Sequence, residues 1–309
     1  MEERTINRHG MKTAVVGLGL IGGSMAIDLR KAGLATHITG IDRDPGHREQ
    51  ALALGLVDSV SDSLDVLSDA DLVILAIPVN AIVSILPSVL ECTGPGAVVF
   101  DAGSTKKQVC QAVSGLAGRG KFVAAHPIAG TENSGPSAAF SGLFSGKTNI
   151  ICDREQSSET AIAVVLRVFD ALGLRSIFMN AEDHDRHVAY VSHLSHVSSF
   201  LLGQTVLDIE KDEKNIFNLA GSGFASTVRL AKSSPDMWAP IFDQNSEYLS
   251  QALQEYIMHL QRFHYLLMKH DQEGLRNIMN GANDIRRILE GIELKQSRAI
   301  TDETKNKNQ

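Results

Sequence analysis

The chain has 309 residues, 43% of them hydrophobic and 21% charged, which is a globular composition at a length that suggests about two domains. A formal net charge of −7 argues against nucleic acid as a partner. Without an apolar run of about 18 residues or a signal-peptide pattern, we expect no membrane partner and a soluble, cytoplasmic protein. Its three cysteines are widely spaced and form no C-x-x-C pair, which predicts reduced thiols.

Residues 13–42 predict a β-α-β unit. The apolar run at residues 13–16 has the length of a buried strand, residues 20–32 have helical periodicity, and residues 37–41 form a second strand-like run. The turn between the first strand and the helix reads GLGLIG at residues 17–22, the G-x-G-x-x-G pattern of dinucleotide-binding folds. A glycine-rich turn that serves packing alone is the alternative.

Each glycine of this turn has a physical role in holding a pyrophosphate. Gly17 permits the tight turn, Gly19 leaves room for phosphates beside the backbone, and Gly22 lets the helix pack closely on the strand. The helix N-terminus adds free N–H groups and a partial positive charge. Asp42 is expected to bind the adenine-ribose hydroxyls and to favour NAD over NADP, a preference that Arg43 weakens unless it is only a surface charge. The predicted cofactor contacts are Gly17, Gly19, Leu20, Ile21, Gly22, Asp42, Arg43, Pro78 and Val79.

Apolar runs alternate with helical segments as far as about residue 180. Strands are expected at 72–77, 98–101, 122–125, 149–152 and 176–178, and helices at 48–54 and 157–172. This alternation predicts an α/β domain with a doubly wound parallel sheet, Rossmann-type, over residues 11–180. Ligands of such sheets bind at the carboxyl ends of strands. The segments that start there are expected to face one crevice: Gly17, Asp42, Pro78 with a loop from Val79, Gly103 and His126.

Strand signals vanish beyond residue 180. Helices are expected at 182–209, 226–231, 238–269 and 272–289, which predicts an all-α substrate and dimerisation domain over residues 181–292, followed by a polar tail at 293–309. Apolar side chains of one helix step by four and three: Leu249, Leu253, Tyr256, Leu260, Phe263 and Leu267. This seam packs either within the chain or against a second copy.

Candidate catalytic residues follow two of the predicted strands. DAGSTK occupies residues 101–106, and HPIAGTE occupies residues 126–132. Pro127 biases His126 towards an extended backbone, so its ring can point off the strand end into the crevice. A neutral histidine there can accept a proton from a substrate hydroxyl. A loop histidine with ordinary hydrogen bonds is the alternative.

A further cluster lies in the helical half. Ser192 and His196 are one turn apart on a helix that also carries His193. The guanidinium of Arg229 suits a carboxylate, although a surface arginine is the plainer interpretation. Four histidines invite a metal site, namely His184, His187, His193 and His196. We expect no metal, because the nearby carboxylates Asp183 and Asp185 resemble first-turn helix charges.

Five segments together resemble the prephenate/arogenate dehydrogenase family of tyrosine biosynthesis. They read GLGLIGGS, DAGSTK, HPIAGTENSG, SHLSH and GFASTVRLAKSSPDMW, and the resemblance spans about residues 12–289. It implies an NAD-dependent prephenate dehydrogenase that converts prephenate to 4-hydroxyphenylpyruvate with loss of CO₂, built as a homodimer through its helical domain. It implies that His126 is catalytic and that Ser104 is its hydrogen-bonding companion. The expected substrate contacts are Thr131, Glu132, Ser192, His196, Arg229 and Trp238.

The chain departs from the family pattern at three serines. Ser195 replaces a proline, while Ser222 and Ser226 replace a glycine and an aspartate, which affects contacts near Trp238 rather than the chemistry. Three alternatives stay open. They are an arogenate dehydrogenase with an amino side chain on the substrate, a β-hydroxyacid dehydrogenase, and a non-catalytic NAD-sensing protein.

Overall fold

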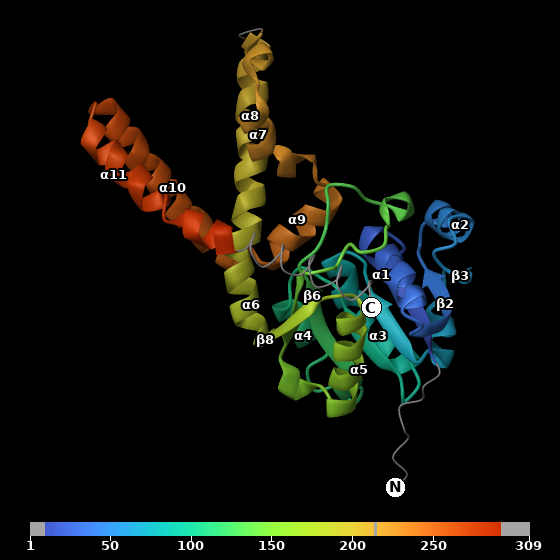
Figure 1. Cartoon of the computed structure of the whole chain (residues 1–309). Coiled ribbons are helices and arrows are strands. Elements are labelled where there is room, and N and C mark those ends of the chain that lie inside the picture. The colour runs from blue at the N-terminus through green and yellow to red at the C-terminus, as the bar shows by residue number, and fades with distance from the viewer. Residues whose placement is uncertain (1–9, 213–214, 292–309) are drawn as a thin grey trace, which may run out of the picture. The chain divides into compact units, whose positions relative to one another are not determined.

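The computed structural model describes residues 10–212 and 215–291 (Figure 1). The chain forms two compact units, Met1–Asn245 and Ser246–Gln309. The first contains a sheet and helices up to α9, and the second contains α10 and α11. Along the described residues, no helix combines the length and the apolar character needed to span a bilayer. The tail predicted at 293–309 lies outside the described residues.

The first unit is built on an eight-stranded sheet in the order β3-β2-β1-β4-β5-β6-β7-β8. The strands are β1 (Met11–Val16), β2 (Ala35–Ile41), β3 (Ser59–Ser61), β4 (Leu72–Leu75), β5 (Val98–Asp101), β6 (Phe122–Pro127), β7 (Thr148–Cys152) and β8 (Arg175–Met179). The order reverses beside β1, as in doubly wound folds, which confirms the predicted fold class. The strand that the sequence did not predict is β3, because Ser-Val-Ser is short and carries a single apolar residue.

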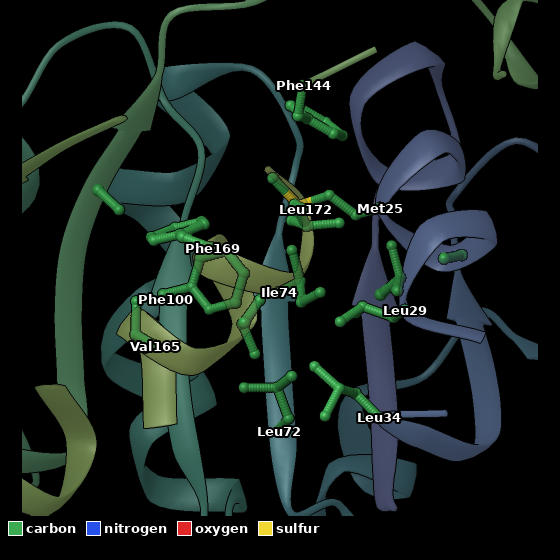
Figure 2. Packing of buried hydrophobic residues seen from close by; sticks show 14 of the residues in the cluster. Met25, Leu29, Leu34, Leu72, Ile74, Phe100, Phe144, Val165, Phe169 and Leu172 are labelled. Carbon is green, nitrogen blue, oxygen red and sulfur yellow. The ribbon is translucent and has the colours of Figure 1, made fainter. Parts of the chain in front are cut away.

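Helices cover both faces of this sheet. They are α1 (Leu20–Lys31), α2 (Pro45–Ala53), α3 (Val79–Cys92), α4 (Lys107–Ala112) and α5 (Glu159–Ala171). Strand β4 is buried on both sides, with Leu72 and Ile74 in the core beneath α1 and α5, and Val73 and Leu75 in the core beneath α3 and α4. Figure 2 shows the first of these cores, where Phe100 of β5 packs with α5.

Two predicted features of this unit differ in the structure. Strand β7 pairs antiparallel with β6, because the chain reaches it through residues 128–147, which contain a short 3₁₀ turn but no crossover helix. Strand β8 is parallel to β7, so both run against the other strands. The loop expected after Pro78 is the first turn of α3, which begins at Val79.

The helices that follow the sheet are more broken than predicted. The helix expected at 182–209 is α6 (Ala181–Val188), a π-helical turn (Ala189–His193) and α7 (Leu194–Asp212). The helix expected at 226–231 is α8 (Ser222–Thr227) with a 3₁₀ turn (Arg229–Lys232). The helix expected at 238–269 is α9 (Pro235–Gln244) and α10 (Ser246–Met268). The break falls at Asn245, whose buried side-chain amide bonds to other segments of the first unit.

In the second unit, α10 and α11 (Gln272–Ala282) form a helical hairpin (Figure 1). His270 has a positive φ of 52° in the turn between them. The carboxylate of Asp271 caps α11 by accepting a hydrogen bond of 2.9 Å from the N–H of Gly274. Helix α11 is shorter than the predicted 272–289, because a turn at residues 283–284 separates it from helical residues 285–291.

Candidate active site

The glycine turn has the shape that a dinucleotide needs. Gly17 has a positive φ of 99°, and a Cβ added there would overlap the carbonyl oxygen of Ala76. A Cβ added at Gly22 would overlap the carbonyl oxygen of Gly17, so α1 packs closely on β1. At Gly19, by contrast, the nearest atom to an added Cβ is the nitrogen of Gly135 at 4.0 Å. Crowding therefore requires glycine at positions 17 and 22, whereas the space beside Gly19 is open to a ligand.

The N-terminus of α1 has no side-chain cap and can bind an anion. Gly19 is its N-cap and supplies no side-chain hydrogen bond, and the first turn, which contains Leu20 and Ile21, carries no acidic residue. Helices usually satisfy these N–H groups with a serine, threonine or carboxylate. An uncapped start beside an open glycine fits the pyrophosphate of NAD.

Asp42 is fixed at the end of β2. Its carboxylate accepts hydrogen bonds of 3.0 Å from the N–H groups of Leu18 and Asp44. Arg43 is exposed, and Nδ1 of His47 lies 3.4 Å from Oδ2 of Asp42. Pro78 precedes α3, while the Val79 side chain is buried against Trp238.

His126 lies at the carboxyl end of β6. It is held by two residues that the sequence did not identify as its partners. Its Nδ1 lies 2.8 Å from Nε2 of His184, and Nδ1 of His184 lies 2.7 Å from Oδ1 of Asp185. Both His184 and Asp185 are buried. The backbone N–H groups of Lys106 and Lys107 donate to the two oxygens of Asp185, at 2.8 and 2.9 Å.

These contacts fix the tautomer of His126. Since backbone N–H groups donate to both oxygens of Asp185, its carboxylate accepts from Nδ1–H of His184. A neutral His184 then offers a lone pair at Nε2, which accepts from Nδ1–H of His126. The lone pair of His126 is therefore on Nε2, the atom that can take a proton from a substrate.

A buried ion pair keeps a positive charge near His126. The ammonium of Lys106 bonds to Asp101, and both side chains are fully buried. Asp101 also accepts from the N–H groups of Gly103 and Ala125, at 2.9 and 3.1 Å. Burial, then His184 and Lys106, lower the pKa of His126 well below its ordinary value. The ring is thus neutral and able to act as a base at neutral pH.

Ser104 lies in the turn after β5. Among the described residues no hydrogen bond joins its hydroxyl to His126, so its role as companion stays a prediction. Its neighbour Thr105 donates to Oε1 of Gln244 at 2.6 Å, which ties this turn to the end of α9.

The predicted substrate residues come together in two groups. In the first, His196 stacks on Trp238 with ring centroids 3.4 Å apart, and its Nδ1 lies 3.0 Å from the carbonyl oxygen of Ser192. In the second, Nη1 of Arg229 lies 3.7 Å from Oε2 of Glu132. Arg229 is 55% exposed, so its guanidinium is accessible to a ligand carboxylate. Thr131, next to Glu132, accepts from the N–H of Asn133 at 3.2 Å.

Two buried donors, one on His193 and one on Trp238, have no hydrogen-bond partner among the described residues. Nδ1 of His193 pairs with Nδ2 of Asn245 at 3.0 Å, which places the proton of a neutral His193 on Nε2. Nε2 of His193 and Nε1 of Trp238 are both buried without a hydrogen bond, and the two ring centroids are 5.9 Å apart. Buried donors usually find an oxygen, so a water or a substrate oxygen fits there. Burial lowers the pKa of His193 to about 4.

The sequence contains one signal for the missed pair. Asp185 shares a helix face with the buried Ala181 and Val188, four and three residues away, so it points into the protein. The helix start is served by Asn180, whose Oδ1 accepts from the N–H of Asp183 at 2.7 Å. The expectation that Asp185 is a first-turn helix charge is therefore wrong. Among the described residues, no group of three or more histidine, cysteine, aspartate or glutamate side chains could hold a metal ion.

The three serines that depart from the family pattern lie on α7 and α8. Ser195 is exposed on α7. Ser222 is the first residue of α8, and the hydroxyl of Ser226 donates to the carbonyl oxygen of Gly223 at 2.9 Å. This hydrogen bond involves neither His126 nor Arg229.

Comparison with known proteins gives concordant matches. The family described as prephenate dehydrogenase, nucleotide-binding domain, matches residues 25–178, and that described as prephenate dehydrogenase, dimerization domain, matches residues 180–281. A cyclohexadienyl dehydrogenase of Zymomonas mobilis is 31% identical, over 88% of this chain and 92% of its own length.

Two solved structures are similar over most of the chain. The prephenate dehydrogenase of Aquifex aeolicus in complex with hydroxyphenyl propionate and NAD⁺ has a TM-score of 0.84 at 30% identity, covering 92% of this chain and 100% of its own. The arogenate dehydrogenase of Synechocystis has a TM-score of 0.70 at 30% identity, covering 90% and 100%.

We expect Asp42→Asn to relax discrimination between cofactors. The amide oxygen can still accept from Leu18, but the charge that repels a 2′-phosphate is gone. The ratio of the Kd for NADP⁺ to the Kd for NAD⁺ should fall about 10-fold, measured by titration of the protein with each nucleotide. Asp44→Asn, a charge loss in the cap of α2, is the control and should leave the ratio unchanged. Equal affinities in the unaltered protein would contradict the role of Asp42.

Acid should destabilise the protein between about pH 6.5 and 4. The pKa of His193 is lowered from 6.5 to about 4 on folding, so the unfolded chain binds this proton more readily in that window. For His193 alone, each pH unit lost there removes about 1.4 kcal/mol from the free energy of unfolding. Urea midpoints measured at pH 7, 6 and 5 should therefore fall. His193→Asn keeps an acceptor for Asn245 without titrating, and should make this dependence shallower; an unchanged dependence would refute the assignment.

Proposed function

The chain belongs to the prephenate dehydrogenase family, and from this membership and the His126 site we propose that it is an NAD-dependent prephenate dehydrogenase. The reaction is the oxidative decarboxylation of prephenate to 4-hydroxyphenylpyruvate, a step of tyrosine biosynthesis. The observation that carries this proposal is the ring of His126, which is hydrogen-bonded at Nδ1 and can accept a proton at Nε2. The ring lies at the carboxyl edge of the sheet, where the glycine turn also lies.

The chemistry asks little of the protein beyond positioning and one proton transfer. Prephenate has a hydroxyl at C4 and a carboxylate at C1, and the bound cofactor supplies the hydride acceptor. Nε2 of His126 takes the C4 hydroxyl proton as the hydride leaves C4. Loss of the C1 carboxylate as CO₂ makes the ring aromatic, which renders the step effectively irreversible.

Arg229 serves substrate binding. Its fork of N–H donors matches a carboxylate, and its exposed guanidinium has a carboxylate neighbour in Glu132 at 3.7 Å. A tighter ion pair would not by itself assist decarboxylation, because the departing carboxylate loses its charge. His196 and Trp238 form an aromatic wall, with Thr131 and Ser192 at the border of the same site.

Arogenate is the second candidate substrate. Arogenate carries an amino acid side chain where prephenate carries a keto acid. The adjacent Glu132 and Arg229 present one negative and one positive group, which complements a zwitterion. Relatives named for arogenate and for cyclohexadienyl substrates support testing both.

A homodimer built by the helical half is part of the proposal. The seam from Leu249 to Leu267 is buried at its start and exposed further along, with Leu260 52% and Leu267 48% exposed. Ile257 and Met258 of the same helix are also exposed. An exposed apolar surface of this kind supports burial against a second copy, as does the match of residues 180–281 to a dimerization domain. The expected cytoplasmic location rests on the sequence.

An assay of NADH formation tests the proposed activity. Purified protein should reduce NAD⁺ with prephenate and release CO₂. Turnover of arogenate alone would move the assignment to arogenate dehydrogenase. Turnover of 3-hydroxy acids, or of none of these compounds, would contradict it.

Two variants should separate the base from the binding residue. His126→Asn keeps hydrogen bonding but cannot take the proton, so kcat should fall about 10²–10⁴-fold with a smaller change in KM. Arg229→Ala should raise KM about 10–100-fold and leave kcat closer to intact, because it acts on ground and transition states alike. Both variants should bind NAD⁺ normally. Near-normal kcat in His126→Asn, or a loss of kcat at unchanged KM in Arg229→Ala, would reverse these roles.

Sedimentation should give twice the chain mass of 33.4 kDa at micromolar concentration. Leu260→Asp places a charge in the exposed part of the seam and should shift the population towards monomer. Gln261→Glu, on the same helix but outside the seam, is the control and should remain dimeric. A monomer in the unaltered protein would remove the dimer proposal.

A further inference from the structure

Behind the base, two buried side chains continue its hydrogen bonding into the protein. We propose that His184 and Asp185 form a proton relay that orients His126 and receives positive charge from it during the reaction. The proposal rests on the proposed function, because it assigns a role to groups behind the same base. Both residues act through His126, so both are positioning residues.

The geometry forms an unbroken line. His126 Nδ1 and His184 Nε2 are 2.8 Å apart, and His184 Nδ1 and Asp185 Oδ1 are 2.7 Å apart. The two imidazole rings meet edge to face, with an interplanar angle of 67°. His184 is fully buried, so no solvent competes for either of its nitrogens.

Asp185 is held from several directions. Its carboxylate accepts from the backbones of Lys106 and Lys107, and its carbonyl oxygen accepts from Nδ2 of Asn245 at 2.7 Å. A carboxylate fixed in this way gives His184 one orientation. His184 in turn gives His126 one tautomer, with the basic lone pair on Nε2.

The relay moves two protons by one step each, and no proton is gained or lost overall. The C4 hydroxyl proton goes to Nε2 of His126, and the proton on Nδ1 of His126 passes to Nε2 of His184. The O–H bond of the substrate breaks while the hydride leaves C4, so the carbonyl forms there. His126 is neutral again, and the cation resides on His184 beside the carboxylate of Asp185.

Electrostatics favours this location for the charge. A cation on His126 is opposed by burial, by His184 and by the ammonium of Lys106, which lower its pKa. Burial also lowers the pKa of His184, but Asp185 opposes that shift through its hydrogen bond and its charge. The other charged groups that act on His184 are Lys106 and Asp101, which bond to each other. Every cause that acts on His126 disfavours the cation there, whereas Asp185 attracts the proton to His184, and this difference favours the inner histidine.

The plainer interpretation is that His184 and Asp185 only tie α6 to α4. A structural tie would predict reduced stability in variants, with no effect on proton transfer. Both interpretations keep the same hydrogen bonds, so they differ in the number of protons in flight during the reaction, which is measurable.

His184→Gln is the informative variant. The glutamine oxygen can still accept from Nδ1–H of His126, but the amide cannot take up the proton. We expect kcat for prephenate to fall about 10–100-fold with KM and the Kd for NAD⁺ unchanged. The solvent isotope effect should vary non-linearly with deuterium content in the unaltered enzyme, as for two protons in flight, and linearly in the variant. His187→Gln, on the exposed side of α6, is the matched control and should behave as the unaltered enzyme.

A measurement on the resting protein tests the relay without turnover. Nitrogen NMR of histidine-labelled protein should show His126 with its proton on Nδ1. A proton on Nε2 of His126, or a kcat in His184→Gln within about twofold of normal, would overturn the relay. A relay-type NMR signature in a protein that oxidises neither prephenate nor arogenate would instead overturn the proposed function.

Discussion

The carboxylate of Asp185 is the contact on which the catalytic geometry depends. It bonds to the turn after β5 through the backbones of Lys106 and Lys107, and to His184 on its own helix. Through Asn245 its backbone also reaches His193 in the π-helical turn. A buried carboxylate is costly unless its lone pairs are satisfied, and here they are. Segments more than 70 residues apart in the chain are thereby held around one base.

The buried pair of Asp101 and Lys106 complements this anchor. Each oxygen of Asp101 accepts from backbone or ammonium donors, so neither charge is left uncompensated. Replacing such a pair by apolar residues is often neutral for stability, so stability alone is a weak reason to keep it. Its electrostatic effect offers another, since the ammonium disfavours a charged His126. Asp185, Asp101 and Lys106 thus determine both the position of His126 and its protonation state before the reaction.

Local patterns were enough to predict seven of the eight strands and the cofactor turn. Residues 11–42 carry their own periodicity and glycine spacing, and the structure follows them closely. The direction of β7 could not be predicted, because it depends on how residues 128–147 turn back rather than on the strand itself. The same holds for Asp185, whose partners lie 78 and 79 residues away. His126 could be predicted as the base because it follows a strand. Its partner His184 could not be predicted, because the pairing depends on where α6 packs.

The reversal of β7 has a consequence for how the gene can change in length. Because β7 and β8 run against β6, the chain leaves β8 at the edge where β6 begins, and Ala181 is pinned there by the carboxylate of Asp153 at 2.8 Å. From that pin, His184 is three residues along a helix. Each helical residue turns a side chain by about 100°, so one codon gained or lost between 181 and 184 would swing the imidazole away from His126. Insertions and deletions are therefore far more restricted at the start of α6 than in a surface loop.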